Sequence, residues 1–172
     1  RRHRRRDGPV IRVAGLIAAA ALTLASCGGS GESGETLPDV DITGLESGDS
    51  ILLSDIEGPA VVNLWATWCA PCRAEIPDFE EVHRARRAEV RFVGINVGED
   101  PAVAAGFIEE VGATYDQFAD LDGEVSTELQ ATSMPVTVVI DEDGVITTRH
   151  LGPLDQQGLD EAIDEALAVS SS

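Results

Sequence analysis

A nearly continuous apolar run, AVVNLWA from Ala60 to Ala66, leads almost directly into two cysteines, Cys69 and Cys72. An uninterrupted apolar run of this length is typical of a strand that is buried on both faces of a sheet. After the cysteines, apolar residues recur at helical spacing: Ile76, Phe79 and Val82. The pattern therefore predicts a buried strand that runs into a helix, with both cysteines at the junction.

The rest of the chain alternates between strand and helix signals. Asp100 and Pro101 indicate a helix start, and Gly112 indicates its end. The other predicted elements are strands over 90–97 and 115–118, a helix over 124–130, two β-branched runs joined by DEDG, and a closing helix striped by Leu159, Ile163 and Leu167. Because parallel strands need a crossover helix, we predict an α/β domain whose central mixed sheet is covered by helices on both faces.

The position of the cysteines predicts their chemistry. If the strand ends before Cys69, that residue lies at the helix N-terminus, where unpaired amides and the helix dipole stabilise an anion. The pKa of its thiol should then fall below the free value of ~8.5, which makes Cys69 the nucleophile. Cys72 lies three residues later on the same face, within reach of a disulfide. Pro71 suits the first helical turn, where its missing N–H has no partner to lose.

The N-terminal residues have the layout of a targeting segment. A basic stretch, RRHRRRDGPVIR, precedes 14 uncharged residues, 13–26, which is shorter than the roughly 20 that span a membrane. LASC, residues 24–27, resembles the bacterial lipoprotein signal, which implies lipidation of Cys27 and cleavage before it; ordinary cleavage and an uncleaved anchor are the alternatives. We predict a signal peptide over 1–26, a flexible tether over 27–36 and one domain over 37–172.

The predicted mature chain is strongly acidic. Residues 27–172 contain 6 arginines, no lysine and 30 acidic residues, a net charge of about −24. Genome composition and solubility are the simplest explanation, and a surface suited to high salt or to a basic partner is the alternative. Either way, this charge argues against nucleic acid as a partner and against electrostatic attraction to anionic lipid.

WATWCAPCRAE, Trp65 to Glu75, resembles the active site of the thioredoxin superfamily. It is most similar to the membrane-anchored, extracytoplasmic branch of TlpA, ResA and CcmG-type thiol-disulfide oxidoreductases. The likeness extends from Leu37 through the DEDG hairpin and includes the proline before VTVVIDEDG. The resemblance implies a thioredoxin fold with an N-terminal strand extension and a helical insertion.

The resemblance also implies roles for individual residues. Pro135 matches the cis-proline that faces the disulfide, and Met134 would offer backbone groups to a substrate peptide; an ordinary proline at a strand start is the alternative. Glu75 matches an acidic residue of the ResA-like branch that would accept a proton from Cys72. A carboxylate that only complements the helix dipole is the alternative for Glu75.

One position departs from cytosolic thioredoxin, because Asn63 stands where thioredoxin keeps a buried aspartate. An amide cannot take a proton at neutral pH, so any base role must pass to Glu75 or to water. Trp65 and Trp68 are expected to shield the site, and Trp68 to contact substrate, although core aromatics would give the same pattern. Arg73 is expected to project into solvent rather than to add positive potential near the thiolate.

Other uses of the cysteine pair are less well supported. A metal site would have to combine Cys69 and Cys72 with His83 or His150, whereas zinc sites normally need four ligands, and both histidines are expected on the solvated surface. Copper-carrying relatives on this fold use a C-x-x-x-C spacing with a distal histidine, and peroxiredoxin-type peroxidases use a different motif around their cysteine. A structural staple would close only a four-residue loop and add little stability.

We therefore predict a lipid-anchored thiol-disulfide oxidoreductase on the extracytoplasmic face of the cell membrane. It would reduce disulfides in exported proteins, for example at the haem-attachment cysteines of apocytochrome c, and would be recharged by a membrane electron donor. The first alternative is a thiol oxidase that introduces disulfides into secreted proteins, and a copper-delivery module is the second. We expect a monomer that needs no metal and no cofactor.

Overall fold

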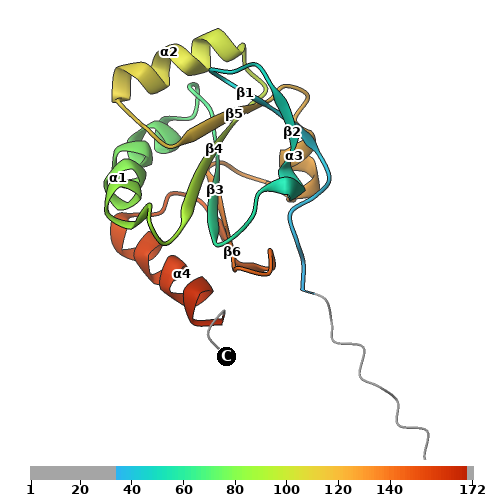
Figure 1. The fold of residues 1–172 in the computed structure, drawn as a ribbon. Coiled ribbons are helices and arrows are strands. Elements are labelled where there is room, and N and C mark those ends of the chain that lie inside the picture. Colours follow the sequence, from blue (N-terminus) through green and yellow to red (C-terminus); the bar gives the residue numbers. More distant parts are fainter. Residues whose placement is uncertain (1–33, 170–172) are drawn as a thin grey trace, which may run out of the picture. The chain divides into compact units, whose positions relative to one another are not determined.

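The computed structural model describes residues 34–169. The predicted signal peptide, Cys27 and most of the predicted tether lie outside this range. Seven strands are described: β1 (Asp41–Gly44), β2 (Ser50–Leu52), β3 (Ala60–Trp65), β4 (Arg91–Val97), β5 (Asp116–Asp120), β6 (Val136–Ile140) and β7 (Ile146–Leu151). They form one mixed sheet in the order β2-β1-β5-β4-β3-β6-β7 (Figure 1). The predicted α/β class with a mixed sheet is confirmed.

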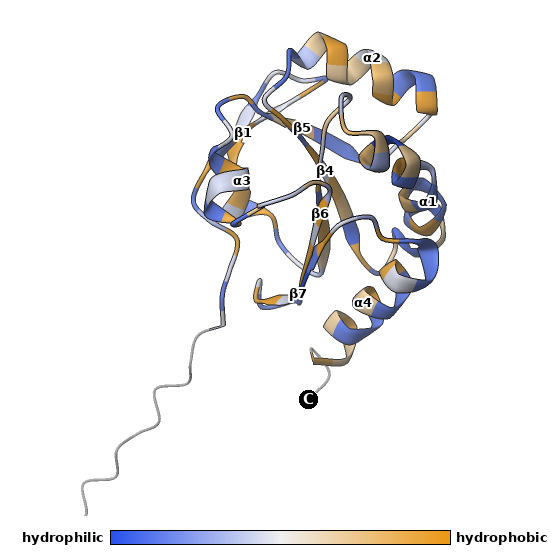
Figure 2. Ribbon diagram, turned by 180° about the vertical axis from the view of Figure 1, so that it is seen from behind, coloured by the Kyte–Doolittle hydropathy of each residue, from blue (hydrophilic) through white to orange (hydrophobic). Residues whose placement is uncertain are grey.

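Four α-helices cover the sheet: α1 (Ala70–Arg86), α2 (Pro101–Val111), α3 (Glu124–Glu128) and α4 (Gln156–Val169). Helices α1, α2 and α4 lie on one side of the sheet and α3 lies on the other (Figure 1). Hydrophobic and hydrophilic residues alternate along α2 and α4, as expected of helices with one face on a sheet (Figure 2). Within residues 34–169, no helix is both long enough and apolar enough to cross a membrane.

Strand β3 lies at the centre of the domain. It pairs in parallel with β4 and antiparallel with β6, and all six of its residues are buried. Because side chains alternate along a strand, Val62 and Leu64 pack into the cluster that contains α3 residues. Val61 packs with α1 and α4, and Trp65 packs with α1 and α2. This two-sided burial is what the apolar run predicts.

The N-terminal part of the domain forms the predicted strand extension. Hairpin β1-β2 adds to the outer edge of β5 in antiparallel pairing. Upstream of it, the N–H of Ile146 donates to the carbonyl of Glu35 at 2.7 Å, and Thr36 forms a bridge with Val145. Glu35 also pairs with Arg149 at 2.6 Å. Glu35 and Thr36, which fall within the predicted tether, therefore contact the domain.

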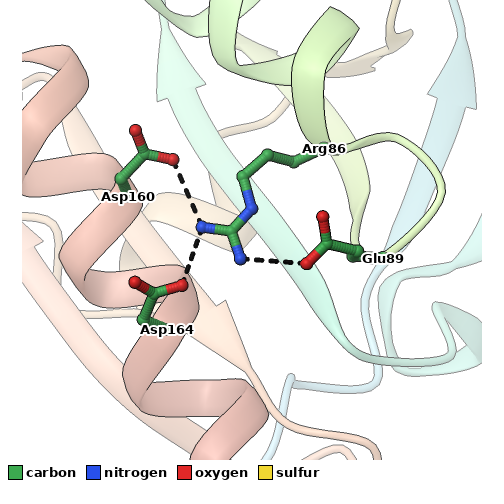
Figure 3. A network of polar contacts seen from close by, with 4 residues as sticks. All are labelled: Arg86, Glu89, Asp160 and Asp164. Carbon is green, nitrogen blue, oxygen red and sulfur yellow. Dashed lines mark hydrogen bonds and ion pairs between the residues drawn. The ribbon is translucent and has the colours of Figure 1, made fainter.

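A set of ion pairs joins the C-terminal end of α1 to α4 (Figure 3). The guanidinium of Arg86 lies 2.8 Å from Asp164, 3.3 Å from Asp160 and 3.1 Å from Glu89. Three carboxylates around one arginine restrict how α1 can move against α4. Since the cysteines lie at the other end of α1, this network helps to fix the helix that carries them.

His83 corrects one prediction. It was expected on the solvated surface, but its ring packs against Phe92 and Tyr115, with centroids 5.3 Å and 5.7 Å away. Burial lowers the pKa of His83; Glu80 and Asp116 oppose this shift, and two neighbouring arginines add to it. The reason is helical spacing, because His83 follows Phe79 by four residues and so shares the buried face of α1.

Candidate active site

The two cysteines lie where the sequence places them, at the start of α1. Cys69 is the N-cap residue, and its sulfur accepts a hydrogen bond from the backbone N–H of Cys72 at 3.3 Å. Pro71 occupies the first turn. The cysteines form a disulfide, with their Cα atoms 5.3 Å apart. The predicted pairing of Cys69 with Cys72 is therefore geometrically available without any movement of the backbone.

The two sulfurs differ in accessibility. Cys69 is 5% exposed, whereas Cys72 is 0% exposed. Only Cys69 can be reached by a large substrate, and its cap position aims helix amides at its sulfur. The geometry therefore favours Cys69 as the attacking thiolate and Cys72 as the resolving thiol.

Aromatic side chains surround the disulfide. Trp65 is fully buried in the same cluster as both cysteines, and its ring centroid lies 5.7 Å from that of Phe107. Trp68 is 67% exposed and directly precedes Cys69, so it is available to a substrate. Arg73 is exposed, as expected, and its guanidinium also lies over the Phe107 ring, 5.3 Å from the centroid.

The proline singled out in the sequence also lies at the site. The peptide bond between Met134 and Pro135 is cis. Met134 packs against the cluster that contains both cysteines, and Pro135 is buried at the start of β6. The segment therefore lies beside the disulfide, as the resemblance implies. Its contact with a substrate peptide stays a prediction.

Glu75 is a buried carboxylate one turn after Cys72. It is 3% exposed, and it accepts hydrogen bonds from Asn63 Nδ2 at 2.8 Å and from the N–H of Leu154 at 3.0 Å. Burial raises the pKa of Glu75 to about 7, although the hydrogen bonds from Asn63 and Leu154 oppose this rise. A carboxyl group with this pKa can take up and release a proton near neutral pH.

Asn63 acts as a donor at this site. Its Nδ2 also reaches the hydroxyl of Thr137 at 3.3 Å, while its Oδ1 has no hydrogen-bond partner among the described residues. The sequence pointed separately to Asn63 and to Glu75. Their direct contact follows from strand alternation, because Asn63 shares the face of β3 that packs against α1.

Two further polar contacts were not predicted. Trp65 Nε1 donates to Gln117 Oε1 at 3.0 Å. Glu99, in the loop between β4 and α2, accepts hydrogen bonds from Thr67 and Asn96. The contacts of Trp65 with Gln117 and of Thr67 with Glu99 join residues more than 30 positions apart, so local patterns carry no sign of them. The available signal was the predicted parallel pairing of the two central strands, whose ends must meet at one edge.

The two histidines within residues 34–169, His83 and His150, are not part of the cluster that contains the disulfide. His150 Nε2 lies 3.3 Å from the carbonyl oxygen of Pro153. His83 lies near the C-terminal end of α1, far along the helix from the cysteines, and packs among aromatic rings. Within residues 34–169, no three His, Cys, Asp or Glu side chains are grouped so that they could hold a metal ion.

The known proteins to which the chain is similar include thiol-disulfide oxidoreductases. The model of the AhpC/TSA family matches residues 33–149. The chain is 33% identical to the thiol:disulfide interchange protein DsbE of Pseudomonas aeruginosa over 72% of this chain and 69% of that protein. It is 29% identical to the thiol-disulfide oxidoreductase ResA of Geobacillus kaustophilus over 76% of each. A crystal structure of a DsbE-type protein from Chlorobium tepidum matches 77% of this chain and 96% of that chain, with a TM-score of 0.70 and 27% identity.

Proposed function

The chain belongs to the AhpC/TSA family, and from this premise we propose that it reduces disulfides in exported proteins on the extracytoplasmic side of the membrane. It is a thioredoxin-like thiol-disulfide oxidoreductase. The observation that carries the proposal is the pairing of a capping, accessible Cys69 with a buried Cys72. Glu75, one turn later, adds a proton acceptor whose pKa burial raises to about 7.

The reaction consists of two exchanges. The Cys69 thiolate attacks one sulfur of a substrate disulfide, which forms a mixed disulfide and releases the first substrate thiolate. Glu75 then takes the proton of the Cys72 thiol, and the Cys72 thiolate attacks Cys69 Sγ. This step forms the Cys69–Cys72 disulfide and releases the second substrate thiolate. The substrate gains two electrons and the enzyme loses two, which a membrane electron donor must return.

The surface around Cys69 would hold the substrate chain. Trp68 is exposed and directly precedes Cys69, and Met134, which precedes Pro135, packs against the cluster that contains the disulfide. A short extended segment around a substrate cysteine fits such a surface better than a folded domain. The haem-attachment cysteines of apocytochrome c are a substrate of this kind, and we propose them as one target.

The proposed location rests on the N-terminal sequence. Cleavage before Cys27 and lipidation of its thiol would anchor the enzyme, and two acyl chains give stable attachment. Mass spectrometry of the N-terminal peptide from membranes tests this directly. A mature chain that begins at an unmodified residue other than Cys27 would contradict the anchor and leave the redox proposal intact.

The direction of electron flow is tested by the reduction potential of the Cys69–Cys72 couple, measured on the whole protein in a defined thiol buffer. A reductase should give a potential near the −270 mV of thioredoxin. The oxidase is the second candidate, because stabilisation of the Cys69 thiolate by the helix end favours the reduced form. A potential near −120 mV would support the oxidase and overturn the reductase.

A further inference from the structure

Glu99 makes a set of contacts that the exchange reaction above does not use. One carboxylate oxygen accepts the backbone N–H of Thr67 at 2.7 Å and the Nδ2 of Asn96 at 2.7 Å. The other oxygen accepts a hydrogen bond from the hydroxyl of Thr67. Both oxygens of Glu99 are therefore engaged, and two of the three donors belong to the segment that precedes the active cysteine.

The held N–H belongs to the peptide group that orients Cys69. The Ala66–Thr67 peptide is planar, with the N–H of Thr67 at one end and the C=O of Ala66 at the other. That carbonyl accepts the backbone N–H of Cys69 at 3.2 Å. By holding the Thr67 N–H, Glu99 fixes the plane of this peptide and, through it, the turn that places Cys69 at the cap of α1.

Glu99 is itself anchored to the sheet. Asn96 pairs with Trp65 in the parallel register of β3 and β4, and it is 0% exposed. Gly98 adopts a left-handed conformation with φ of 67° and donates its N–H to the carbonyl of Asp120 at 2.9 Å. Glycine adopts this conformation at little cost. The loop is therefore tied to β5 on one side and, through Glu99, to the end of β4 on the other.

Glu99 is a charged acceptor. Burial alone would raise its pKa, but the hydrogen bonds from Thr67 and Asn96 outweigh this effect and leave the pKa of Glu99 below its ordinary value. The group is ionised at neutral pH, and hydrogen bonds to an ionised acceptor are stronger than those between neutral groups. The hydrogen bonds from Thr67 to the ionised Glu99 are therefore present under the conditions in which the thiols react.

We propose that Glu99 is a positioning residue, which holds the Ala66–Thr67 peptide and thereby keeps the Cys69 sulfur at the helix end where its thiolate is stabilised. The inference rests on the thiol chemistry of the proposed function but not on its direction. Without the carboxylate, the loop before Cys69 loses two of its anchors, and the sulfur spends less time among the helix amides. Cys69 should then ionise less readily and attack more slowly.

The test compares E99A with E99Q in the whole reduced protein, with E109A on exposed α2 as the matched control. The readout is the rate of alkylation of Cys69 by iodoacetamide as a function of pH, followed on the Cys69 peptide by mass spectrometry so that Cys27 and Cys72 do not contribute. E99A should react about tenfold more slowly at pH 7, with a thiol pKa higher by about one unit. E99Q keeps an acceptor oxygen and should stay within about threefold of the parent protein.

Two results would overturn the proposal. E99A could react within twofold of the parent, as E109A should, or E99A could react faster than the parent, which would mean that the negative charge of Glu99 acts on the thiolate and that the held peptide does not. If E99A fails to fold, amide hydrogen exchange of the parent protein decides: the Thr67 N–H should be strongly protected, and exchange as fast as that of an exposed loop amide would contradict the role. Neither measurement involves a protein substrate, so a failure of the reductase proposal is separate.

Discussion

Two glutamates hold segments next to the cysteines, and their surroundings shift the pKa values of the two carboxyl groups in opposite directions. Glu75 is 3% exposed and receives two hydrogen bonds, and burial raises its pKa to about 7. Glu99 is half-buried and receives three, which lower its pKa despite the effect of burial. The balance between burial and donors thus suits Glu75 to the proposed transfer of a proton and keeps Glu99 ionised at neutral pH.

The two carboxylates also lie close in structure to different cysteines of the pair. Glu75 follows Cys72 by one turn of α1, whereas Glu99 holds the loop that enters α1 before Cys69. In our proposals, these two acidic groups therefore act at different steps of the exchange. The following experiments break or sharpen this comparison.

The largest effect is expected from the cysteines themselves. C69S should lower disulfide exchange by about 1000-fold or more, since it removes the attacking sulfur. C72S should keep the first attack and accumulate a mixed disulfide with the substrate, which mass spectrometry detects. If C72S were the inactive variant and C69S trapped the substrate, the roles of the two cysteines, and of the carboxylates beside them, would be exchanged.

Stability should depend on pH through Glu75. Because its pKa in the folded protein lies above the ordinary value of 4.5, its favourable contribution is complete below pH 4.5 and is lost as the pH rises through 7. The loss is on the order of 3 kcal/mol.

Urea unfolding of oxidised parent and E75Q proteins measures this loss as a difference between pH 5 and pH 9. E75Q should lack the decline, since a neutral amide has no charge to bury. E99Q is the matched comparison with the opposite sign, because the lowered pKa of Glu99 gives stability above pH 4.5 that is lost in acid. Parallel curves for the parent and E75Q would show that Glu75 titrates like a free side chain.

Kinetics should separate the two carboxylates. In E75Q, attack of Cys72 on a preformed mixed disulfide should slow by about 100-fold above pH 7, because a proton acceptor is lost. Alkylation of Cys69 should stay within about twofold of the parent rate. E99A should show the reverse pattern, and equal slowing of both steps in E75Q would indicate a general loosening of the site.

A second carboxylate beside Glu75 should produce the smallest change. N63D replaces the donor to Glu75 by an acid, and two adjacent carboxyl groups cannot both ionise easily. The pH at which resolution of the mixed disulfide becomes fast should rise by about one unit, or about tenfold in rate at pH 7. T137V, which removes only the other partner of Asn63, should leave the pH profile in place. An unchanged profile in N63D would mean that the new acid replaces Glu75 as the base.

Much of the fold follows from local patterns. The buried strand β3, the cysteines at the start of α1, and the helix bounded by Asp100 and Gly112 were all predicted, because periodicity and capping are local properties. The pairing of Thr36 with Val145 was not predicted, since it depends on a hairpin more than 100 residues away.

The site was predicted residue by residue but not as a set of contacts. The sequence carries signals for Cys69, Cys72 and Pro135. The two cysteines form the disulfide, and Pro135 follows Met134, which packs against their cluster. The contact of Thr67 with Glu99 depends on the register of β3 against β4, which no local pattern gives. Arg73 is exposed as expected, but its contact with Phe107 was not predicted, because Phe107 lies on another helix.

The chain has only two tryptophans, Trp65 and Trp68. Trp65 is fully buried in the same cluster as the disulfide, whereas Trp68 is exposed to solvent. A disulfide quenches the emission of a nearby indole, so the light from Trp65 should brighten when the cysteines are reduced. The emission of Trp68 should instead respond to whatever docks on the surface. The redox state and the occupancy of the site can thus be followed by fluorescence in the unlabelled protein.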